Sequence, residues 1–115
     1  MKREARLSRS LDFKRVRRTG RSYAHPLFVL LALPSGLSEV RVGFITSKAV
    51  GGAVERNRTR RRLRAAVDEL FPSFSPGWDM IIIARRAALI ASFDTIKDEL
   101  RTLTIRAGAW NDRGM

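Results

Sequence analysis

The sequence has 115 residues, no cysteine, one histidine, and 23 Lys and Arg against 11 Asp and Glu, which gives a formal net charge of +12. A hydrophobic share of 44% excludes a disordered polyelectrolyte, and the lack of cysteine excludes disulfides and thiolate metal sites. No apolar run approaches the about 20 residues of a membrane span, and the charged N-terminus is unlike a signal peptide. We therefore expect one soluble, cytoplasmic domain over residues 1–115, with no bound metal and no membrane partner.

One helix and three strands are predicted in the first half of the chain. The helix is expected to begin at a capping serine, Ser8 or Ser10, and to end at Gly20. Three strands follow, over residues 22–25, 28–33 and 40–47. Because a Pro-Ser-Gly turn at 34–36 separates the last two strands, we expect them to pair as a hairpin.

The second half is predicted to contain two helices and one strand. A helix is expected over 54–70, followed by a strand over 78–84 that is apolar on both faces. Ser92 is a candidate cap for a last helix that Gly108 ends, and residues 109–115 are expected to form a frayed tail. The order α-β-β-β-α-β-α favours an α+β fold, with helices packed on one small sheet.

The positive charge lies in the first half of the chain. Residues 1–64 carry 17 Lys and Arg and 4 acids, a net charge of +13, whereas residues 65–115 carry 6 and 7, a net charge of −1. Most of the basic residues are arginine, which pairs bidentately with phosphate. This asymmetry indicates a surface for a polyanion, with a basic surface that serves only solubility as the alternative.

The helix over 54–70 carries the densest charge. Its segment from Glu55, E-R-N-R-T-R-R-R-L-R, has six arginines in its last nine positions. At 100° per residue an apolar stripe lies opposite Arg58, Arg61 and Arg62. The stripe consists of Leu63, Ala66, Val67 and Leu70. The pattern predicts a helix with one core face and an arginine face, to which Arg41 adds if its strand lies adjacent.

Two arginines of this helix do not fit the pattern. Arg56 and Arg60 turn toward the core side, so we expect the helix to begin near Asn57, with that residue or one just before it as the N-cap. Arg60 is then expected to reach around the rim toward the sheet. A solvated, salt-bridged face is the alternative to polyanion binding, but only Glu55 and Asp68 are placed to neutralise the row.

A second candidate surface lies on the first helix. Phe13 and Val16 share one side of it, and basic residues surround them: Lys14, Arg15, Arg17, Arg18 and Arg21. An aromatic ring among arginines suits a single nucleic-acid strand, because bases stack on the ring while phosphates are attracted. Pattern alone leaves open that Phe13 is only a core residue, as we expect for Phe28 and Phe44.

No catalytic group is identified in the sequence. His25 has no acid or nucleophile near it in the chain, and a lone histidine is commonly structural. Four aspartates, Asp12, Asp79, Asp94 and Asp98, are isolated or lie on predicted helix surfaces as solvated charges. No phosphate-binding loop is present. We therefore expect any catalysis to come from another component.

The segment over 41–64, R-V-G-F-I-T-S-K-A-V-G-G-A-V-E-R-N-R-T-R-R-R-L-R, resembles the signature of the bacterial ribonuclease P protein subunit. That family has an R-V-G strand, an S-K-K-x-G turn and an R-N-R helix. The L-D-F at 11–13 with Gly20, the D-x-x-x-x-A-R strand at 79–85 and the R-A at 106–107 are also similar to the family. The resemblance therefore covers nearly the whole chain.

This resemblance implies a protein subunit of an endoribonuclease that removes the 5′ leader from precursor tRNA. The RNA subunit is then the catalyst and uses Mg²⁺, while the protein binds no cofactor of its own, carries no catalytic residue and binds no DNA. The implied partners are the ribonuclease P RNA and precursor tRNA. The implied fold is a small α/β sandwich with a four-stranded mixed sheet and a left-handed β-α-β crossover.

The resemblance also implies two sets of site residues. The set for the RNA subunit consists of Lys48, Arg56, Asn57, Arg58, Arg60, Arg61, Arg62 and Arg64. The set for the leader, in a cleft between the first helix and the sheet, consists of Phe13, Lys14, Arg17, Leu31, Ile45 and Arg56. The chain departs from the family pattern at Ala49, where a second lysine is usual, and at Arg17 and Leu31, where aromatic residues occur. We therefore expect the cleft to depend more on charge and apolar contact than on stacking.

Two other classes of protein remain as alternatives. A non-enzymatic RNA-binding module, such as a ribosomal or RNA-chaperone protein, would share the basic helix but need no leader cleft. A DNA-binding regulator fits less well, because no helix-turn-helix with a dimer interface is visible.

Overall fold

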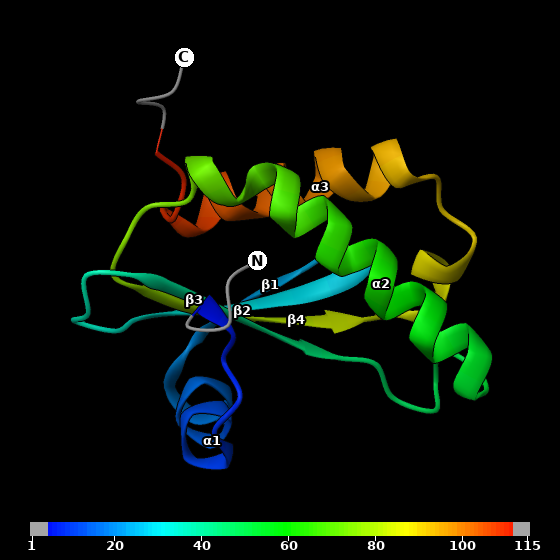
Figure 1. Ribbon diagram of the computed structural model, residues 1–115, viewed down its shortest axis with the longest axis horizontal. Helices are drawn as coiled ribbons and strands as arrows, with labels where there is room; N and C mark the ends of the chain where they lie inside the picture. Colours follow the sequence, from blue (N-terminus) through cyan, green and yellow to red (C-terminus); the bar gives the residue numbers. More distant parts are fainter. Residues whose placement is uncertain (1–4, 112–115) are drawn as a thin grey trace.

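A four-stranded sheet with helices on both faces forms the protein in this computed structural model, which describes residues 5–111 (Figure 1). In chain order the elements are α1 (Ser10–Thr19), β1 (Arg21–Ala24), β2 (Phe28–Pro34), β3 (Val40–Ile45), α2 (Ala53–Leu70), β4 (Trp78–Ala84) and α3 (Phe93–Ala107). Two short 3-10 helices, η2 (Phe71–Ser73) and η3 (Arg86–Leu89), flank β4. The predicted α+β class and element order are confirmed.

The strands lie in the order β1-β2-β4-β3. β2 is antiparallel to both β1 and β4, whereas β3 is parallel to β4 and is joined to it through α2. The predicted hairpin between β2 and β3 is wrong, because β4 lies between them, with Ile81 opposite both Leu31 and Gly43. The turn at 34–36 reverses the chain, but the neighbour of β2 is set by the long apolar strand that arrives later.

The core has two parts, one on each face of the sheet. α2 and α3 cover one face and α1 covers the other, as Figure 1 shows with α1 below the sheet. Along β4, Met80 and Ile82 point to the larger core under α2 and α3, while Ile81 points to the smaller core under α1. β4 is apolar at successive positions because both of its faces are buried.

The starts of α1 and α2 differ from the predictions. α1 has Arg9 at its N-cap and no side-chain cap, so the expected serine cap is wrong. α2 begins at Ala53, four residues before the expected start at Asn57. Glu55 explains this, because its Oε1 accepts a hydrogen bond from the N–H of Gly52 at 2.8 Å and so takes the place of a capping side chain.

The end of the chain matches the predictions only in part. Ser92 caps α3 by accepting a hydrogen bond from the N–H of Thr95, and Gly108 ends the helix in the left-handed conformation, both as predicted. The expected frayed tail is wrong for 109–111, because Ala109 is fully buried and the Trp110 ring packs edge-on against Phe74. The remainder of that predicted tail, 112–115, lies outside the described residues.

Candidate nucleic-acid interface

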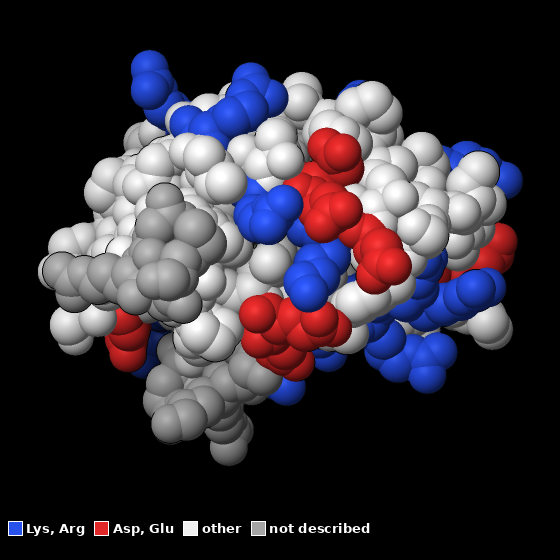
Figure 2. All heavy atoms as spheres, turned by 90° about the horizontal axis from the view of Figure 1, so that it is seen from above, with Lys and Arg blue, Asp and Glu red and all other residues white. Residues whose placement is uncertain are grey.

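α2 carries six arginines outside its buried stripe, which we call the arginine row: Arg56, Arg58, Arg60, Arg61, Arg62 and Arg64. The predicted stripe is confirmed, since all four of its residues are at most 5% exposed. Thr59 joins it as a fully buried residue that the pattern did not identify. Arg58 and Arg61 are exposed. Figure 2 shows basic side chains gathered over the N-terminal part of α2, at the lower right, and a band of acidic side chains across the middle of this face.

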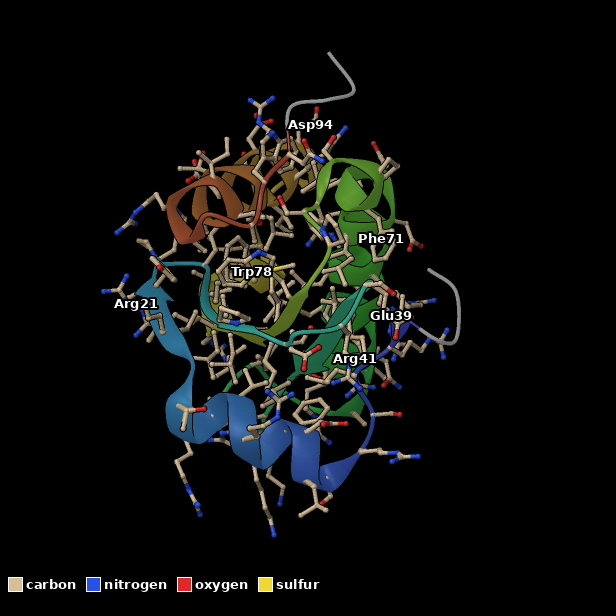
Figure 3. The ribbon with its side chains drawn as sticks, turned by 90° about the vertical axis from the view of Figure 1, so that its left-hand side faces the viewer. Arg21, Glu39, Arg41, Phe71, Trp78 and Asp94 are labelled. Atoms are coloured by element: carbon tan, nitrogen blue, oxygen red, sulfur yellow. The ribbon has the colours of Figure 1, made fainter. Side chains whose placement is uncertain are left out.

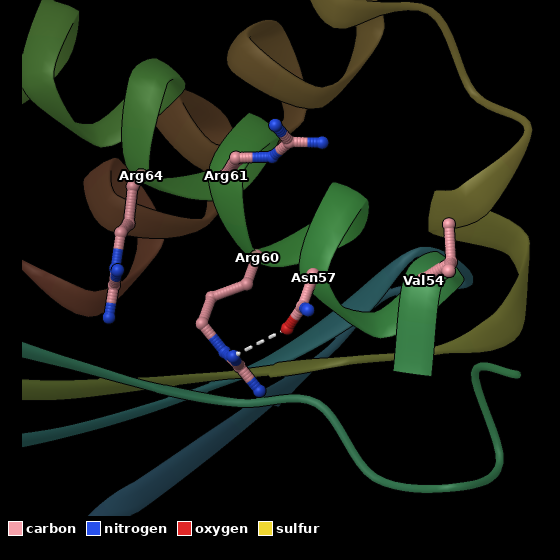
Figure 4. A pocket seen from close by; sticks show the side chains of 5 residues that line it. All are labelled: Val54, Asn57, Arg60, Arg61 and Arg64. Carbon is pink, nitrogen blue, oxygen red and sulfur yellow. Dashed lines mark hydrogen bonds between the residues drawn. The ribbon is translucent and has the colours of Figure 1, made fainter. Parts of the chain in front are cut away.

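A hollow of about 410 Å³ runs along one flank of this helix (Figure 4). Its lining residues are Val54, Asn57, Arg60, Arg61 and Arg64, which recur at the spacing of successive helical turns. Arg60 donates to Thr46 Oγ1 at 2.7 Å and to Asn57 Oδ1 at 3.2 Å. Its predicted reach toward the sheet is therefore confirmed, and the contacts hold its guanidinium at the floor of the hollow.

The arginine row lies on the first two-thirds of α2, where the helix dipole is positive. The six guanidinium groups of the arginine row repel one another and the positive end of the helix dipole. The acidic residue in the first turn of the helix is Glu55, and one carboxylate does not balance six positive charges. Such a helix terminus attracts phosphate, both through its side chains and through its free N–H groups. Lys48 is exposed in the turn before α2 and adds a further positive charge.

Arg62 has a structural role that the sequence pattern did not predict. It is partly buried and donates to the carbonyl oxygens of Ala88 and Leu89 at 3.2 Å each, and also to that of Ala91. The helical pattern predicts Arg62 on the arginine face with Arg58 and Arg61, but its guanidinium is held by these carbonyl oxygens. It joins α2 to the loop between β4 and α3, and its assignment to RNA stays a prediction.

Arg64 connects the arginine row to the edge of the sheet. Its guanidinium lies over the ring of Phe44, 5.8 Å from the centroid, and its buried Nε finds no hydrogen-bond partner among residues 5–111. Phe44, expected in the core, is only partly buried. A second hollow, of about 310 Å³, opens here and is lined by Arg64, Phe44, Phe13 and Arg6 among others. It passes around β3, from α2 toward α1.

An ionic network fixes one flank of α1 to the sheet. Asp79 is fully buried and accepts hydrogen bonds from Arg15 and Arg41, and Asp12 lies 3.3 Å from Arg41. The expectation that Asp12 and Asp79 are isolated, solvated charges is therefore wrong, as is the addition of Arg41 to the unpaired arginines. The hydrogen bond that Arg41 donates to Asp79 raises the pKa of Arg41 above its already high ordinary value.

The opposite flank of α1 borders an open apolar strip on the sheet. Ile45, Ile83, Val29 and Ala24 are register partners across β3, β4, β2 and β1, and the first three are only partly buried. Phe13 stands at the β3 end of this strip. We define the leader strip, named for the ligand that the sequence resemblance predicts, as these four sheet residues together with Phe13 and Arg17, which lies one helical turn after Phe13 on α1.

Phe13 rests over Gly43 of β3. A Cβ at Gly43 would lie 2.5 Å from Phe13 Cζ, so the absence of a side chain there lets the ring lie against the strand. The ring is partly buried and also lines the hollow at the β3 edge. Phe13 is thus neither a fully buried core residue nor a free one, and it bounds both candidate surfaces.

The predicted leader residues do not all meet. Lys14 and Arg18 line a shallow hollow with Leu11 on the outer face of α1, away from the strip. Leu31 is 9% exposed and belongs to the core under α1. Arg56 is partly buried on α2, on the other side of the sheet.

Three strip residues were missed by sequence reasoning. Ala24, Val29 and Ile83 lie on the strip, and the alternation of residues between the two faces of β1, β2 and β4 was the available signal. That alternation indicates which residues share a face once the strand order is known. Because β3 was expected beside β2, this face could not be assembled correctly.

Residues 5–111 contain no group of three or more His, Cys, Asp or Glu side chains placed to hold a metal ion. His25 Nε2 lies 2.9 Å from Glu99, and both carboxylates of the α1 network are occupied by arginine. No helix within the same range is long and apolar enough to span a bilayer.

The sequence model of the ribonuclease P family matches residues 1–108. The chain belongs to the ribonuclease P protein family. It is 40% identical over 113 residues to the ribonuclease P protein component of Herpetosiphon aurantiacus, covering 98% of this chain and 92% of that one. The component of Roseiflexus castenholzii is 45% identical over 109 residues, with 94% and 89% covered.

Solved structures of this family have the same fold. The Staphylococcus aureus RNase P protein superposes with a TM-score of 0.81 at 29% identity, covering 93% of this chain and 98% of that one. For the Thermotoga maritima RNase P protein the TM-score is 0.80 at 26% identity, with 88% and 96% covered. The β3–α2–β4 unit is thus a shared feature of the ribonuclease P protein fold.

Membership in this family establishes the role of the chain. It is the protein subunit of an endoribonuclease that acts in processing the 5′ leader of tRNA, so its partners include an RNA and its substrate is a tRNA precursor. The alternatives of a non-enzymatic RNA-binding module and of a DNA-binding regulator are therefore set aside.

Proposed function

We propose that the protein divides its work between two surfaces that meet at β3. The arginine row of α2, with Lys48 and the 410 Å³ hollow, binds the RNA subunit, and the leader strip holds the 5′ leader of precursor tRNA. The observation that carries this proposal is the hollow shared by Arg64 and Phe13, which connects the two surfaces around one strand.

The arginine row suits a folded RNA better than an extended one. Arg58 and Arg61 project from a regular helix, which fixes the spacing of their Cα atoms, and the Arg60 guanidinium is held by Thr46 and Asn57. Arginines at a set spacing match phosphates whose positions are fixed, as in a folded RNA. Binding through phosphates is strongly weakened by salt.

The leader strip suits a single strand. Its floor is apolar and only partly covered, so bases can contact Val29, Ile83 and Ile45. Phe13 offers an aromatic face, and Arg17 a charge for the backbone. A mature tRNA has no leader to place there, so contacts in the strip favour the precursor and let the product leave.

Catalysis and Mg²⁺ are assigned to the RNA subunit. This assignment is supported by residues 5–111, in which no three His, Cys, Asp or Glu side chains lie together as ligands for a divalent cation. By neutralising phosphates, the protein reduces repulsion between RNA segments and so lowers the Mg²⁺ concentration that cleavage needs. The proposal places the protein in the cytoplasm, with no contact to DNA or membrane.

Reconstitution tests the proposal. Purified protein, a ribonuclease P RNA and labelled precursor tRNA are mixed at low Mg²⁺ and moderate salt, and both cleavage and binding are measured. We expect Arg58→Ala/Arg61→Ala to weaken binding to the RNA subunit, and Phe13→Ala to reduce the preference for precursor over mature tRNA. Equal effects of both variants on both measurements would contradict the division between two surfaces.

A further inference from the structure

Two side chains on the α2 side of β3 each contact an arginine of the arginine row. Phe44 is the penultimate residue of β3 and Thr46 directly follows the strand, so the two lie on the same face. The Arg64 guanidinium lies over the Phe44 ring, 5.8 Å from its centroid, and Arg60 donates to Thr46 Oγ1 at 2.7 Å. Arg60 and Arg64 are one helical turn apart, so one side of α2 is matched to one face of β3.

Arg60 is held by oxygen atoms that carry no charge. One terminal nitrogen of its guanidinium donates to the Thr46 hydroxyl, and the other donates to Asn57 Oδ1 at 3.2 Å. Arg41 is held differently. Figure 3 shows it on the side of the sheet that α1 covers, where it binds both carboxylate oxygens of Asp79. The charge of Arg41 is therefore neutralised by its partner, whereas the partners of Arg60 leave its positive charge intact.

The 410 Å³ hollow beside α2 offers hydrogen-bond donors to a ligand. A guanidinium has five N–H groups, and the bonds of Arg60 to Thr46 and Asn57 use two of them. Asn57 turns its Oδ1 toward Arg60, which leaves its NH₂ group to donate elsewhere. None of the five lining residues drawn in Figure 4 is acidic. Phosphate oxygens are acceptors only, so they suit this lining.

Holding the Arg60 guanidinium in advance reduces the entropy that is lost when RNA binds. A free arginine side chain has many rotamers, and fixing it in one geometry lowers the affinity for the partner. Here the fold itself restrains the guanidinium, because the Thr46 side chain is only 9% exposed and follows directly on a strand of the sheet. The Thr46 hydroxyl is engaged by Arg60, so its effect on a ligand in the hollow passes through that arginine.

Resting on the function proposed above, we propose that Thr46 is a positioning residue for binding of the RNA subunit. Together with Asn57, its hydroxyl holds the Arg60 guanidinium in the hollow, so that a phosphate of the RNA subunit meets a donor that is already in place. Thr46 does not contact the RNA itself. Removing its hydroxyl therefore weakens RNA binding while the net charge of the protein stays the same.

Replacements of Thr46 test this inference in filter binding to a ribonuclease P RNA. Thr46→Val keeps the shape of the side chain and removes the acceptor, and we expect it to bind the RNA about three- to tenfold more weakly. Thr46→Ser keeps the hydroxyl and should bind within about twofold of the wild type. Thr46→Ala should lose as much as Thr46→Val, and it replaces that variant if circular dichroism shows that valine disturbs folding.

The salt dependence of binding separates positioning from charge. Thr46→Val removes no charge, so the slope of its log affinity against log salt should equal that of the wild type. Arg60→Met removes a phosphate contact and should reduce the slope by about 0.7–0.9. A loss of affinity at an unchanged slope is the result expected of a residue that orients a charged group.

Thr59→Val is the matched control, because it makes the same chemical change in a fully buried threonine of α2. The Thr59 hydroxyl has no hydrogen-bond partner among residues 5–111, so its removal should leave RNA affinity unchanged. A double-mutant cycle of Thr46→Val with Arg60→Met completes the design. Because Thr46 acts through Arg60, Thr46→Val should cause no further loss of affinity once Arg60 has been replaced.

The inference is overturned if Thr46→Val or Arg60→Met binds RNA like the wild type, if Thr46→Ser loses as much affinity as Thr46→Val, or if the loss persists in the Arg60→Met background. Each of these outcomes leaves the proposed function intact, provided that Arg58→Ala/Arg61→Ala still weakens RNA binding. If that double variant and Arg60→Met both bind normally, α2 is not the docking surface, and the inference and the proposed function fail together.

Discussion

Arg41 and Asp79 lie directly opposite each other on the parallel strands β3 and β4, and the guanidinium binds both carboxylate oxygens, at 2.8 and 2.7 Å. The pair ties an edge strand to the central strand. Arg15 of α1 binds the same carboxylate from the other side. A single buried acid thus orients the helix that borders the leader strip.

Replacing Asp79 with Asn should destabilise the protein. The change removes the buried counter-charge of Arg15 and Arg41, which keep only their longer contacts to Asp12, although both remain partly in contact with water. We expect a loss of about 2–3 kcal/mol in the free energy of unfolding, measured by urea denaturation. Asp12→Asn is the control, because Asp12 is more exposed and its contacts are longer, and it should cost less than about 1 kcal/mol. Similar losses for the two variants would contradict the central role of Asp79.

Arg58→Ala and Arg61→Ala should weaken RNA binding without changing stability. Both side chains are exposed, and no ion pair involving them is present in the described part of the chain. Each lost phosphate contact should reduce the slope of log affinity against log salt by about 0.7–0.9. Filter binding to the RNA subunit over a range of salt concentrations measures this slope. An unchanged slope in the double variant would argue against α2 as the docking surface, and Arg101→Ala serves as the matched control.

Arg62→Ala should behave differently from its neighbours. Its guanidinium donates to three backbone carbonyls in the loop before α3, so its removal leaves those acceptors unpaired. We expect the free energy of unfolding to fall by about 1–2 kcal/mol, and Arg62→Lys to restore part of it. Thermal unfolding of the Arg62→Ala and Arg61→Ala variants compares the two stability losses, and we expect the loss for Arg62→Ala alone. If only RNA affinity changes, Arg62 is primarily an RNA contact.

Gly43→Ala should displace Phe13 without removing it. The added Cβ would lie 2.5 Å from Phe13 Cζ, so the ring must shift or α1 must move. We expect a stability loss of about 1–3 kcal/mol and a reduced preference for precursor over mature tRNA. Gly36→Ala is not a suitable control, because its φ of 74° is itself unfavourable for alanine.

The control for Gly43→Ala is therefore the double variant Gly43→Ala/Phe13→Leu, in which the smaller side chain relieves the clash with the ring and leaves the tight contact of 3.1 Å to the Leu7 carbonyl oxygen. Its stability should recover in part while its precursor preference does not, because leucine offers no aromatic face. Recovery of both properties would show that packing, and not stacking, explains the effect of Phe13.

The elements of this fold were predictable from local signals, but their neighbours were not. The Ser92 cap, the Gly108 stop and the apolar stripe of α2 all depend on residues within a few positions of each other. The pairing of β2 with β4 joins residues about 50 positions apart, and no turn signal in the sequence reports it. The hairpin prediction was wrong for that reason.

The candidate site shows the same division. Helical spacing alone predicts the arginine row, and it also predicts that Arg60 reaches toward the sheet, where it contacts Thr46. The partners of Asp79 lie 38 and 64 positions away, so an acid that is isolated in the sequence is buried and paired in the structure. Ala109 and Trp110 were missed because a segment of three residues is too short to show any periodicity.

The strand order β1-β2-β4-β3 has a consequence for how the chain folds during synthesis. β3 is formed by residues 40–45, and its partner strand among residues 5–111 is β4, at 78–84, with a single bridge to Arg6 on its other edge. A chain emerging from the ribosome therefore presents β3 and the charged α2 before their main partner has been made. Only the β1–β2 hairpin can form early. The sheet closes in one late step, when β4 inserts between two strands already made, and truncation before Trp78 should leave no folded remainder.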